Sequence, residues 1–218
     1  MLKIERTVLP SPEQWDIIIE GMRNPMNSWD KSDSCIEHIE NPETMNTADF
    51  SFHLGDADHK LMQNLAKAGS VHAKYRRMIP VYLTINAPLY WWKEMDRYRV
   101  GVEMNSCSTM HKIHAKEFTA DDFSHENLTD VSMDVLWDTI DTLNTCRGLF
   151  LVDKNKEWWW QMIQLLPTSY NQRRTVMLNY EVLVGIYRDR KDHKLDEWHT
   201  FCRWIEGLPY SELITGKE

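Results

Sequence analysis

The sequence has few cysteines, and these lie far apart. Four occur in 218 residues, namely Cys35, Cys107, Cys146 and Cys202, and no two of them form a C-x-x-C pair. A zinc site or a disulfide framework normally requires closer or more numerous cysteines. The spacing therefore disfavours both, and it indicates reduced thiols in a cytoplasmic protein.

Long apolar runs and a basic excess are also missing. The sequence contains no run of about 18 apolar residues and no basic-then-apolar leader, so we expect neither a membrane span nor a membrane partner. The formal net charge of −8 argues against a nucleic-acid partner, because phosphate binding needs a concentrated basic face. A local basic pocket for a mononucleotide is still compatible with this charge.

Metal-ligand motifs are absent from the sequence as well. Asp30, Asp33 and Glu37 form the nearest approach to an acidic cluster. Their spacing matches no calcium loop, and acidic residues are common where helices start. We therefore predict no metal site.

What the sequence does contain is a mixture of helical and strand patterns. With 42% hydrophobic and 27% charged residues, the chain can bury one core, so we expect a single domain over residues 1–218. Apolar alternation predicts strands at 2–9, 81–85 and 170–177. Helical spacing predicts helices that start at Pro12 and cover 56–68, 71–77, 89–98, 131–148, 157–166, 178–187 and 196–205. Residues 23–52 look irregular. This mixture predicts an α+β fold, with a mixed sheet flanked by helices.

Residues 80–113 combine several features that suit a ligand site. A strand pattern ends before Pro88, which fits the first turn of a helix. After that helix come two arginines around an aromatic residue, Arg97-Tyr98-Arg99, and then five small polar residues at 105–109. Such a segment suits an anionic, planar ligand. The alternative is that the arginines cap the carbonyls at the helix end and the small residues form a loop.

The order of these features resembles the flavin-dependent thymidylate synthases. The hallmark of that family is Arg-His-Arg followed by Asn-Glu-x-Ser-x-Arg-Tyr. Both arginines of the triplet match Arg97 and Arg99, while Tyr98 replaces the histidine. The second motif is degraded, because the position of its arginine holds Thr109 without a gap, or Met110 with one inserted residue.

A second block of the resemblance lies further along the chain. The family shows Leu-Pro, then an asparagine followed eleven residues later by an arginine. Leu166-Pro167, Asn179 and Arg190 keep this order and spacing. A family arginine four residues before the proline is replaced by Ile163, so two nucleotide-side arginines are missing in total.

The resemblance implies a set of site residues. For the flavin it implies His72, Arg97, Tyr98, Arg99 and Asn179. For the nucleotide substrate it implies Asn105, Ser106, Cys107, Ser108 and Arg190. Arg190 and Cys107 are the candidate catalytic residues, and a small buried thiol that only packs is the alternative for Cys107. The guanidinium groups at 97–99 and at 190 are expected to meet around one phosphate-bearing molecule.

The resemblance also implies an activity. It is methylation of dUMP to dTMP, with FAD as cofactor and methylene tetrahydrofolate and NADPH as co-substrates, in a cytoplasmic homotetramer. The altered motif leaves the nucleotide specificity open, and Arg76, Arg77, Arg173 or Arg174 are candidates to compensate for the missing arginines. The alternative is a non-catalytic nucleotide-binding or assembly protein that kept only the fold.

Three adjacent tryptophans, at 158–160, bear on the oligomer. Successive residues of an α-helix turn by about 100°, so the three cannot share one face. We expect at least one of them to be exposed, or buried against another subunit; an irregular corner of the core is the alternative.

Overall fold

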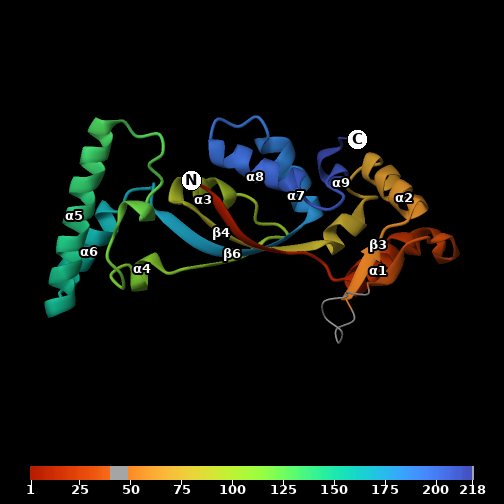
Figure 1. Cartoon of the computed structure of the whole chain (residues 1–218), viewed down its shortest axis with the longest axis horizontal. Helices are drawn as coiled ribbons and strands as arrows, with labels where there is room; N and C mark the ends of the chain where they lie inside the picture. Colours follow the sequence, from red (N-terminus) through yellow and green to blue (C-terminus); the bar gives the residue numbers. More distant parts are fainter. Residues whose placement is uncertain (40–48, 218) are drawn as a thin grey trace. The chain divides into compact units, whose positions relative to one another are not determined.

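The computed structural model describes residues 1–39 and 49–217 (Figure 1). Its strands are β1 (Lys3–Val8), β2 (Cys35–Ile39), β3 (Asp49–His53), β4 (Pro80–Pro88), β5 (Glu103–Ser106) and β6 (Asn171–Asn179). Its α-helices are α1 (Pro12–Arg23), α2 (Asp56–Lys67), α3 (Leu89–Met95), α4 (Thr109–Lys112), α5 (Asp130–Asp153), α6 (Lys156–Leu165), α7 (Tyr180–Arg190), α8 (Asp196–Glu206) and α9 (Glu212–Thr215). Short 3₁₀ turns include η3 (Lys74–Met78).

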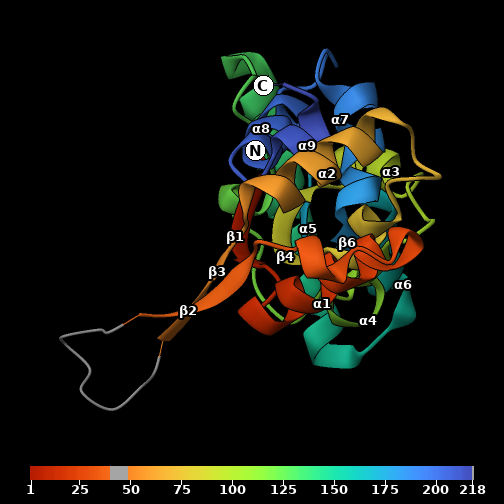
Figure 2. The same cartoon turned by 90° about the vertical axis from the view of Figure 1, so that its right-hand side faces the viewer.

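The strands form two sheets. One has four strands in the order β1-β4-β6-β5, so the N-terminal strand lies at an edge, as its sequence pattern predicts. The other is the antiparallel β2–β3 hairpin, in which Cys35 pairs with His53 (Figure 2). Helices and strands from separate parts of the chain make up the structure, and the predicted α+β fold is confirmed.

The chain divides into two compact units. The first unit contains Met1–Arg6, Leu83–Arg99 and Met104–Val176, and the second contains Thr7–Tyr82, Val100–Glu103 and Met177–Glu218. Boundaries between the two units fall inside β1, β4, β5 and β6.

The first unit has a core built around α5 and α6. These two helices pack against each other and against the segment that follows α4. The buried members of this cluster, which we call the α5–α6 core, are Ile113, Phe118, Phe123, Leu136, Ile140, Leu143, Cys146 and Met162. Trp158 and Trp159 pack on it, whereas Trp160 is 42% exposed, so the prediction that at least one of the three tryptophans is exposed is confirmed.

The second unit has a core built around α7, which packs against η3, α8 and α9. Leu183, Ile186 and Phe201 are completely buried there. Helix α1 begins as its sequence predicts, because Ser11 Oγ accepts the Gln14 N–H and Gln14 Oε1 accepts the Ser11 N–H at 2.9 Å. The buried face of α1 then packs on η3 and the β2–β3 hairpin.

Several predicted boundaries are wrong. Helix α5 runs through Gly148 to Asp153, because open space surrounds Gly148 and nothing forces a break there. The predicted helix at 71–77 is only the 3₁₀ turn η3, and α3 ends three residues earlier than predicted. The stretch predicted as irregular contains β2 and β3. Among the described residues, we find no helix long and apolar enough to cross a membrane.

Candidate functional site

Arg97, Tyr98 and Arg99 lie in the turn that follows α3. Backbone bonds close this turn, with the Arg97 N–H donating to Glu94 O and the Tyr98 N–H to Met95 O. Both arginine side chains are exposed, and Arg99 Nε donates to the Asp96 carbonyl at 3.0 Å. One arginine therefore helps to satisfy the carbonyls that the helix end leaves open, while both guanidinium groups stay accessible to a ligand.

Asn179, a predicted flavin residue, caps helix α7. Its Oδ1 accepts the Val182 N–H at 3.1 Å. Gly101 approaches the same place with a left-handed φ of +76°, and a Cβ on it would lie 3.3 Å from Asn179 Nδ2 and 3.2 Å from Val182 Cγ2. A glycine is required at 101 by both the conformation and the close approach. Both residues belong to the second unit.

The small polar residues after Gly101 form strand β5 and the start of α4. Asn105 and Ser106 are exposed on β5. Ser108 caps α4, with its Oγ accepting the His111 N–H at 2.9 Å, so its own hydroxyl proton is left to donate elsewhere. The Cys107 thiol is exposed, and the alternative of a buried, merely packed thiol is therefore wrong.

The backbone of Cys107 is held on both sides by strand β6. Its N–H donates to Arg173 O at 2.9 Å, and its carbonyl accepts the side-chain N–H of Gln172 at 3.1 Å. Gln172 is itself buried. Position 107 is consequently fixed while its side chain points outward.

Arg174 is the cation most closely integrated into this part of the first unit. Its guanidinium carbon lies 4.3 Å from the centroid of the Trp92 ring. Its Nη1 lies 2.6 Å from Asp96 Oδ1, and its Nε donates to Gln172 Oε1 at 2.9 Å. Nothing in the spacing of the sequence indicates this arrangement, because Asp96 and Arg174 are 78 positions apart.

The remaining sequence candidates lie in the second unit. His72 is exposed in the turn before η3. Arg190 ends α7 and is buried, with its guanidinium carbon 4.7 Å from the centroid of the Trp198 ring. Because Arg97 and Arg99 belong to the first unit, the meeting of these guanidinium groups around one ligand stays a prediction.

Comparison with known proteins places this geometry in a known fold. No family model and no curated protein matches the sequence. Two solved structures of the flavin-dependent thymidylate synthase ThyX from Helicobacter pylori, with FAD and dUMP, do match by shape. Each has a TM-score of 0.64 at 14% sequence identity, and the alignments cover 98% of this chain and 96% and 95% of theirs.

The chain has the ThyX fold. At the level of structure, this fold confirms the resemblance that Arg97, Arg99 and the second sequence block indicate. The similarity extends over nearly the whole chain, so the differences from the family motifs occur within a retained fold.

Ile163 and Thr109 stand where the resemblance implies nucleotide-side arginines, and their surroundings differ. Ile163 lies on α6 and packs against the α5–α6 core. Thr109 begins α4, next to Ser108. Ile163 is thus part of the apolar packing, whereas Thr109 places a small hydroxyl next to the exposed residues 105–108.

The arginines expected to compensate already have partners. Arg76 pairs with Glu181 at 2.8 Å, and Arg77 contacts Ser70 O at 3.4 Å. Arg173 pairs with Glu5 at 2.7 Å, and Arg174 is held as described above. None of the four therefore restores a missing ligand contact without giving up or sharing one that it makes now.

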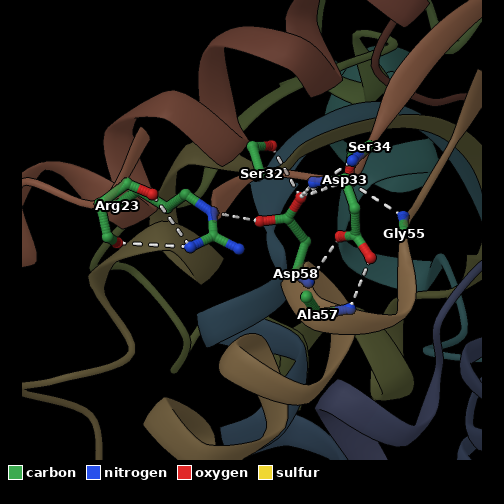
Figure 3. A network of polar contacts seen from close by, with 8 residues as sticks. Arg23, Ser32, Asp33, Ser34, Gly55, Ala57 and Asp58 are labelled. Carbon is green, nitrogen blue, oxygen red and sulfur yellow. Dashed lines mark hydrogen bonds and ion pairs between the residues drawn. The ribbon is translucent and has the colours of Figure 1, made fainter. Parts of the chain in front are cut away.

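A network of polar contacts in the second unit joins the buried Asp58 to Asp33, one of the acidic residues noted in the sequence (Figure 3). Asp33 accepts the Ala57 and Asp58 N–H groups, at 2.8 and 3.0 Å, and so caps the start of α2. Asp58 accepts five hydrogen bonds, from Arg23, Ser32, the Asp33 N–H and the N–H and hydroxyl of Ser34. Within the described residues no group of three or more His, Cys, Asp or Glu could hold a metal ion.

Asp58 is ionised for a physical reason. Burial raises its pKa, but the hydrogen bonds from Ser34, Ser32 and Arg23 outweigh burial and hold the pKa below the ordinary value. These hydrogen bonds tie the start of α2 to Arg23 and to residues 32–34.

The second unit also contains a cavity of about 370 Å³ between α2, α7 and α9. Five of its lining residues are cations: Lys67, Arg76, Arg188, Lys191 and Lys217. Three of these have carboxylate partners, because Arg76 pairs with Glu181, Arg188 with Asp189 and Lys217 with Glu206. The positive potential of the cavity is thus largely compensated, and we assign no ligand to it.

Proposed function

We propose that this protein binds FAD and a pyrimidine nucleotide and methylates dUMP to dTMP, with a rearranged nucleotide site. The observation that carries the proposal is the retention of the ThyX fold over 98% of the chain, relative to a protein whose structures hold FAD and dUMP. The exposed Arg97 and Arg99, at the positions of the family's arginine pair, support it.

The residues of the first unit fit the phosphates of a flavin dinucleotide. Phosphate oxygens need charged or N–H donors, and the exposed guanidinium groups of Arg97 and Arg99 supply them. Tyr98, half-buried between them, offers a ring and a hydroxyl. From the second unit, His72 and the Nδ2 group of Asn179 are the proposed contributors. When bound, FAD would supply the reducing equivalents for methyl formation.

The nucleotide side relies mainly on neutral donors. Asn105, Ser106 and the hydroxyl of Ser108 are exposed or point their donors outward, and the Cys107 thiol lies between them. Each charge-assisted hydrogen bond contributes roughly 1.5–3 kcal/mol, so losing two arginines weakens nucleotide binding by orders of magnitude unless Arg190 or another group offsets it. We therefore expect weak dUMP binding or a preference for an altered pyrimidine nucleotide.

Methylene tetrahydrofolate and NADPH are the proposed co-substrates, and the homotetramer is the proposed assembly. Exposed apolar side chains on α5 and α6 support a subunit contact. These side chains are Val131, Val135, Trp137, Leu149, Leu151, Val152, Trp160 and Leu165. Large exposed apolar residues gathered on two helices commonly mark an interface. Size-exclusion chromatography with light scattering measures the assembly directly, and a purely monomeric protein would contradict it.

Flavin binding is the first test. The purified protein, with FAD added, should show an oxidised-flavin spectrum that stays with the protein on gel filtration. Tritium release from 5-tritiated dUMP, in the presence of methylene tetrahydrofolate and NADPH, then tests the reaction. A protein that retains flavin but releases no tritium at saturating dUMP acts on another substrate.

A non-catalytic role is the second candidate, and one observation favours it. Ile163 packs against the α5–α6 core, at a position where the resemblance implies a nucleotide-side arginine. A protein that stays colourless with added FAD, yet binds a pyrimidine nucleotide in a calorimetric titration, would support a nucleotide-binding or assembly protein.

A further inference from the structure

The segment 96–107, between α3 and α4, carries most of the candidate residues of the first unit. It begins at Asp96, next to Arg97 and Arg99, and it ends at Cys107, next to Ser106 and Ser108. Its first and last residues are both held by one stretch of β6, residues 172–174.

The beginning of the segment is held by Arg174. The Asp96 carboxylate accepts a hydrogen bond from Arg174 Nη1 at 2.6 Å, while the guanidinium carbon lies 4.3 Å from the centroid of the Trp92 ring. Trp92 is completely buried, and its Nε1 donates to Gln172 O at 2.8 Å. A planar guanidinium can stack on a ring and bond at its edge at once, and a lysine ammonium cannot.

The end of the segment is held by Gln172. Its Oε1 accepts from Arg174 Nε at 2.9 Å, and its Nε2 donates to the Cys107 carbonyl at 3.1 Å. The two groups thus form a continuous chain of contacts from Asp96 through Arg174 and Gln172 to Cys107. The Gln172 amide has both a donor and an acceptor; the acceptor binds Arg174, which holds Asp96, and the donor binds Cys107.

We propose that Arg174 and Gln172 are positioning residues, which fix Arg97 and Arg99 relative to the small polar residues 105–108. The proposal deepens the proposed function, since it states how the first unit's share of the flavin and nucleotide donors is set in place. Donors that are already fixed bind a ligand with less loss of conformational freedom. The sequence has no signal for this role, because the contacts join residues 65 and 78 positions apart.

We call the chain of contacts from Asp96 through Arg174 and Gln172 to Cys107 the clamp. Hydrogen exchange of the unliganded protein tests the clamp and requires no measurement of enzyme activity. Arg174→Met should speed exchange by about tenfold in peptides covering 96–99 and 105–108, because Asp96 loses its guanidinium partner and Gln172, which holds Cys107, loses the contact that orients its side chain. Arg173→Met is the matched control, because Arg173 is the neighbouring cation on β6 and its side chain pairs with Glu5 instead. This control should leave exchange in both peptides within about twofold.

Two further variants separate the arms of the clamp. Asp96→Asn should loosen mainly the peptide over 96–99. Gln172→Glu keeps an acceptor for Arg174 but places a carboxylate against the Cys107 carbonyl, so it should loosen mainly 105–108. Arg174→Lys should restore part of the protection at 96–99 and little at 105–108, because an ammonium lacks the second, edge-on donor.

Ligand affinity connects the clamp to the site. If the protein binds FAD, Arg174→Met should weaken binding about tenfold in a fluorescence titration, and Arg173→Met should not. Unchanged exchange in Arg174→Met would overturn the proposal, and so would unchanged FAD affinity in a loosened variant. A wild-type protein that ignores FAD but shows the exchange pattern would overturn the proposed function alone, leaving the clamp as a feature of the fold.

Discussion

Two arginine–aspartate pairs with the same 2.6 Å separation serve different purposes in the two units. In the second unit, Arg23 and Asp58 are 4% and 0% exposed. In the first, Arg174 and Asp96 are 15% and 42% exposed. The buried pair is part of the core, whereas the other lies at the edge of an exposed segment. Distance alone therefore does not show what an ion pair does; its burial and its other partners do.

The partners explain the difference. Asp58 collects donors from the chain between Ser32 and Ser34 as well as from Arg23, and so it organises a turn and a helix start together. Asp96 receives one guanidinium, which continues to Gln172. Loss of the first pair should strongly destabilise the second unit, and loss of the second pair should loosen a single segment.

Asp58→Ala is expected to have the largest effect. It leaves the buried guanidinium of Arg23 without its carboxylate, which should lower the free energy of unfolding by about 3–5 kcal/mol. Urea unfolding followed by tryptophan fluorescence measures this change. Asp56→Ala, an exposed carboxylate in the same turn, is the control and should change stability by less than about 1 kcal/mol. Equal effects of the two substitutions would contradict the comparison.

Gly55→Ala should be the next most harmful. A Cβ at this position would overlap the Asp33 side chain and lie 2.5 Å from its carbonyl carbon, so the cap of α2 would have to move. Overpacking of this kind typically lowers stability by about 1–3 kcal/mol. Gly148→Ala, in the open middle of α5, should instead stabilise by about 0.5–1 kcal/mol. Thermal unfolding of both variants against wild type shows whether the signs are opposite.

Acid should partly reproduce the loss of Asp58. Its pKa is lowered in the folded state, so its contribution is complete above the ordinary carboxyl pKa of about 4 and disappears as the pH falls through the lower, folded value. Stability measured from pH 6 down to pH 2.5 should therefore fall more steeply for wild type than for Asp58→Asn. Parallel curves would show that other carboxylates cause the loss.

The smallest effect on stability is expected at another ion pair of the first unit, between Arg173 and Glu5. Arg173 and Glu5 are 60% and 28% exposed, and Arg173→Met should change the unfolding free energy by less than about 0.5 kcal/mol. Arg174→Met, which also loses its contact with Trp92, should change it by about 1 kcal/mol. Urea titrations of the two variants, made side by side, test whether this ranking holds.

Local signals in the sequence predict local structure well. Ser11 and Pro12 mark the start of α1 because capping depends on residues three positions apart. The same reasoning fails at Gly148, where an intrinsic helix breaker is tolerated because its neighbours in α5 continue to pack. The β2–β3 hairpin is missed although β3 alternates as Asp-Phe-Ser-Phe-His, because this five-residue pattern is short and follows a stretch rich in turn signals.

For the candidate site, the sequence predicts which residue types take part but not the contacts that hold them in place. Arg97 and Arg99 are recognisable by their motif, and their exposure agrees with a binding role. The contacts that fix the segment come from β6, and nothing in the local sequence encodes contacts across such separations. The same holds for Asp33, whose carboxylate caps a helix that starts 23 positions later.

The Asp58 network also has a consequence for the order in which the protein is made. A ribosome adds Arg23 and the serines at 32 and 34 to the chain before it adds Asp58. Until then, these donors have no common acceptor, and Asp33 has no helix start to cap. This corner of the molecule can therefore be completed only after the first turn of α2 has emerged from the ribosome.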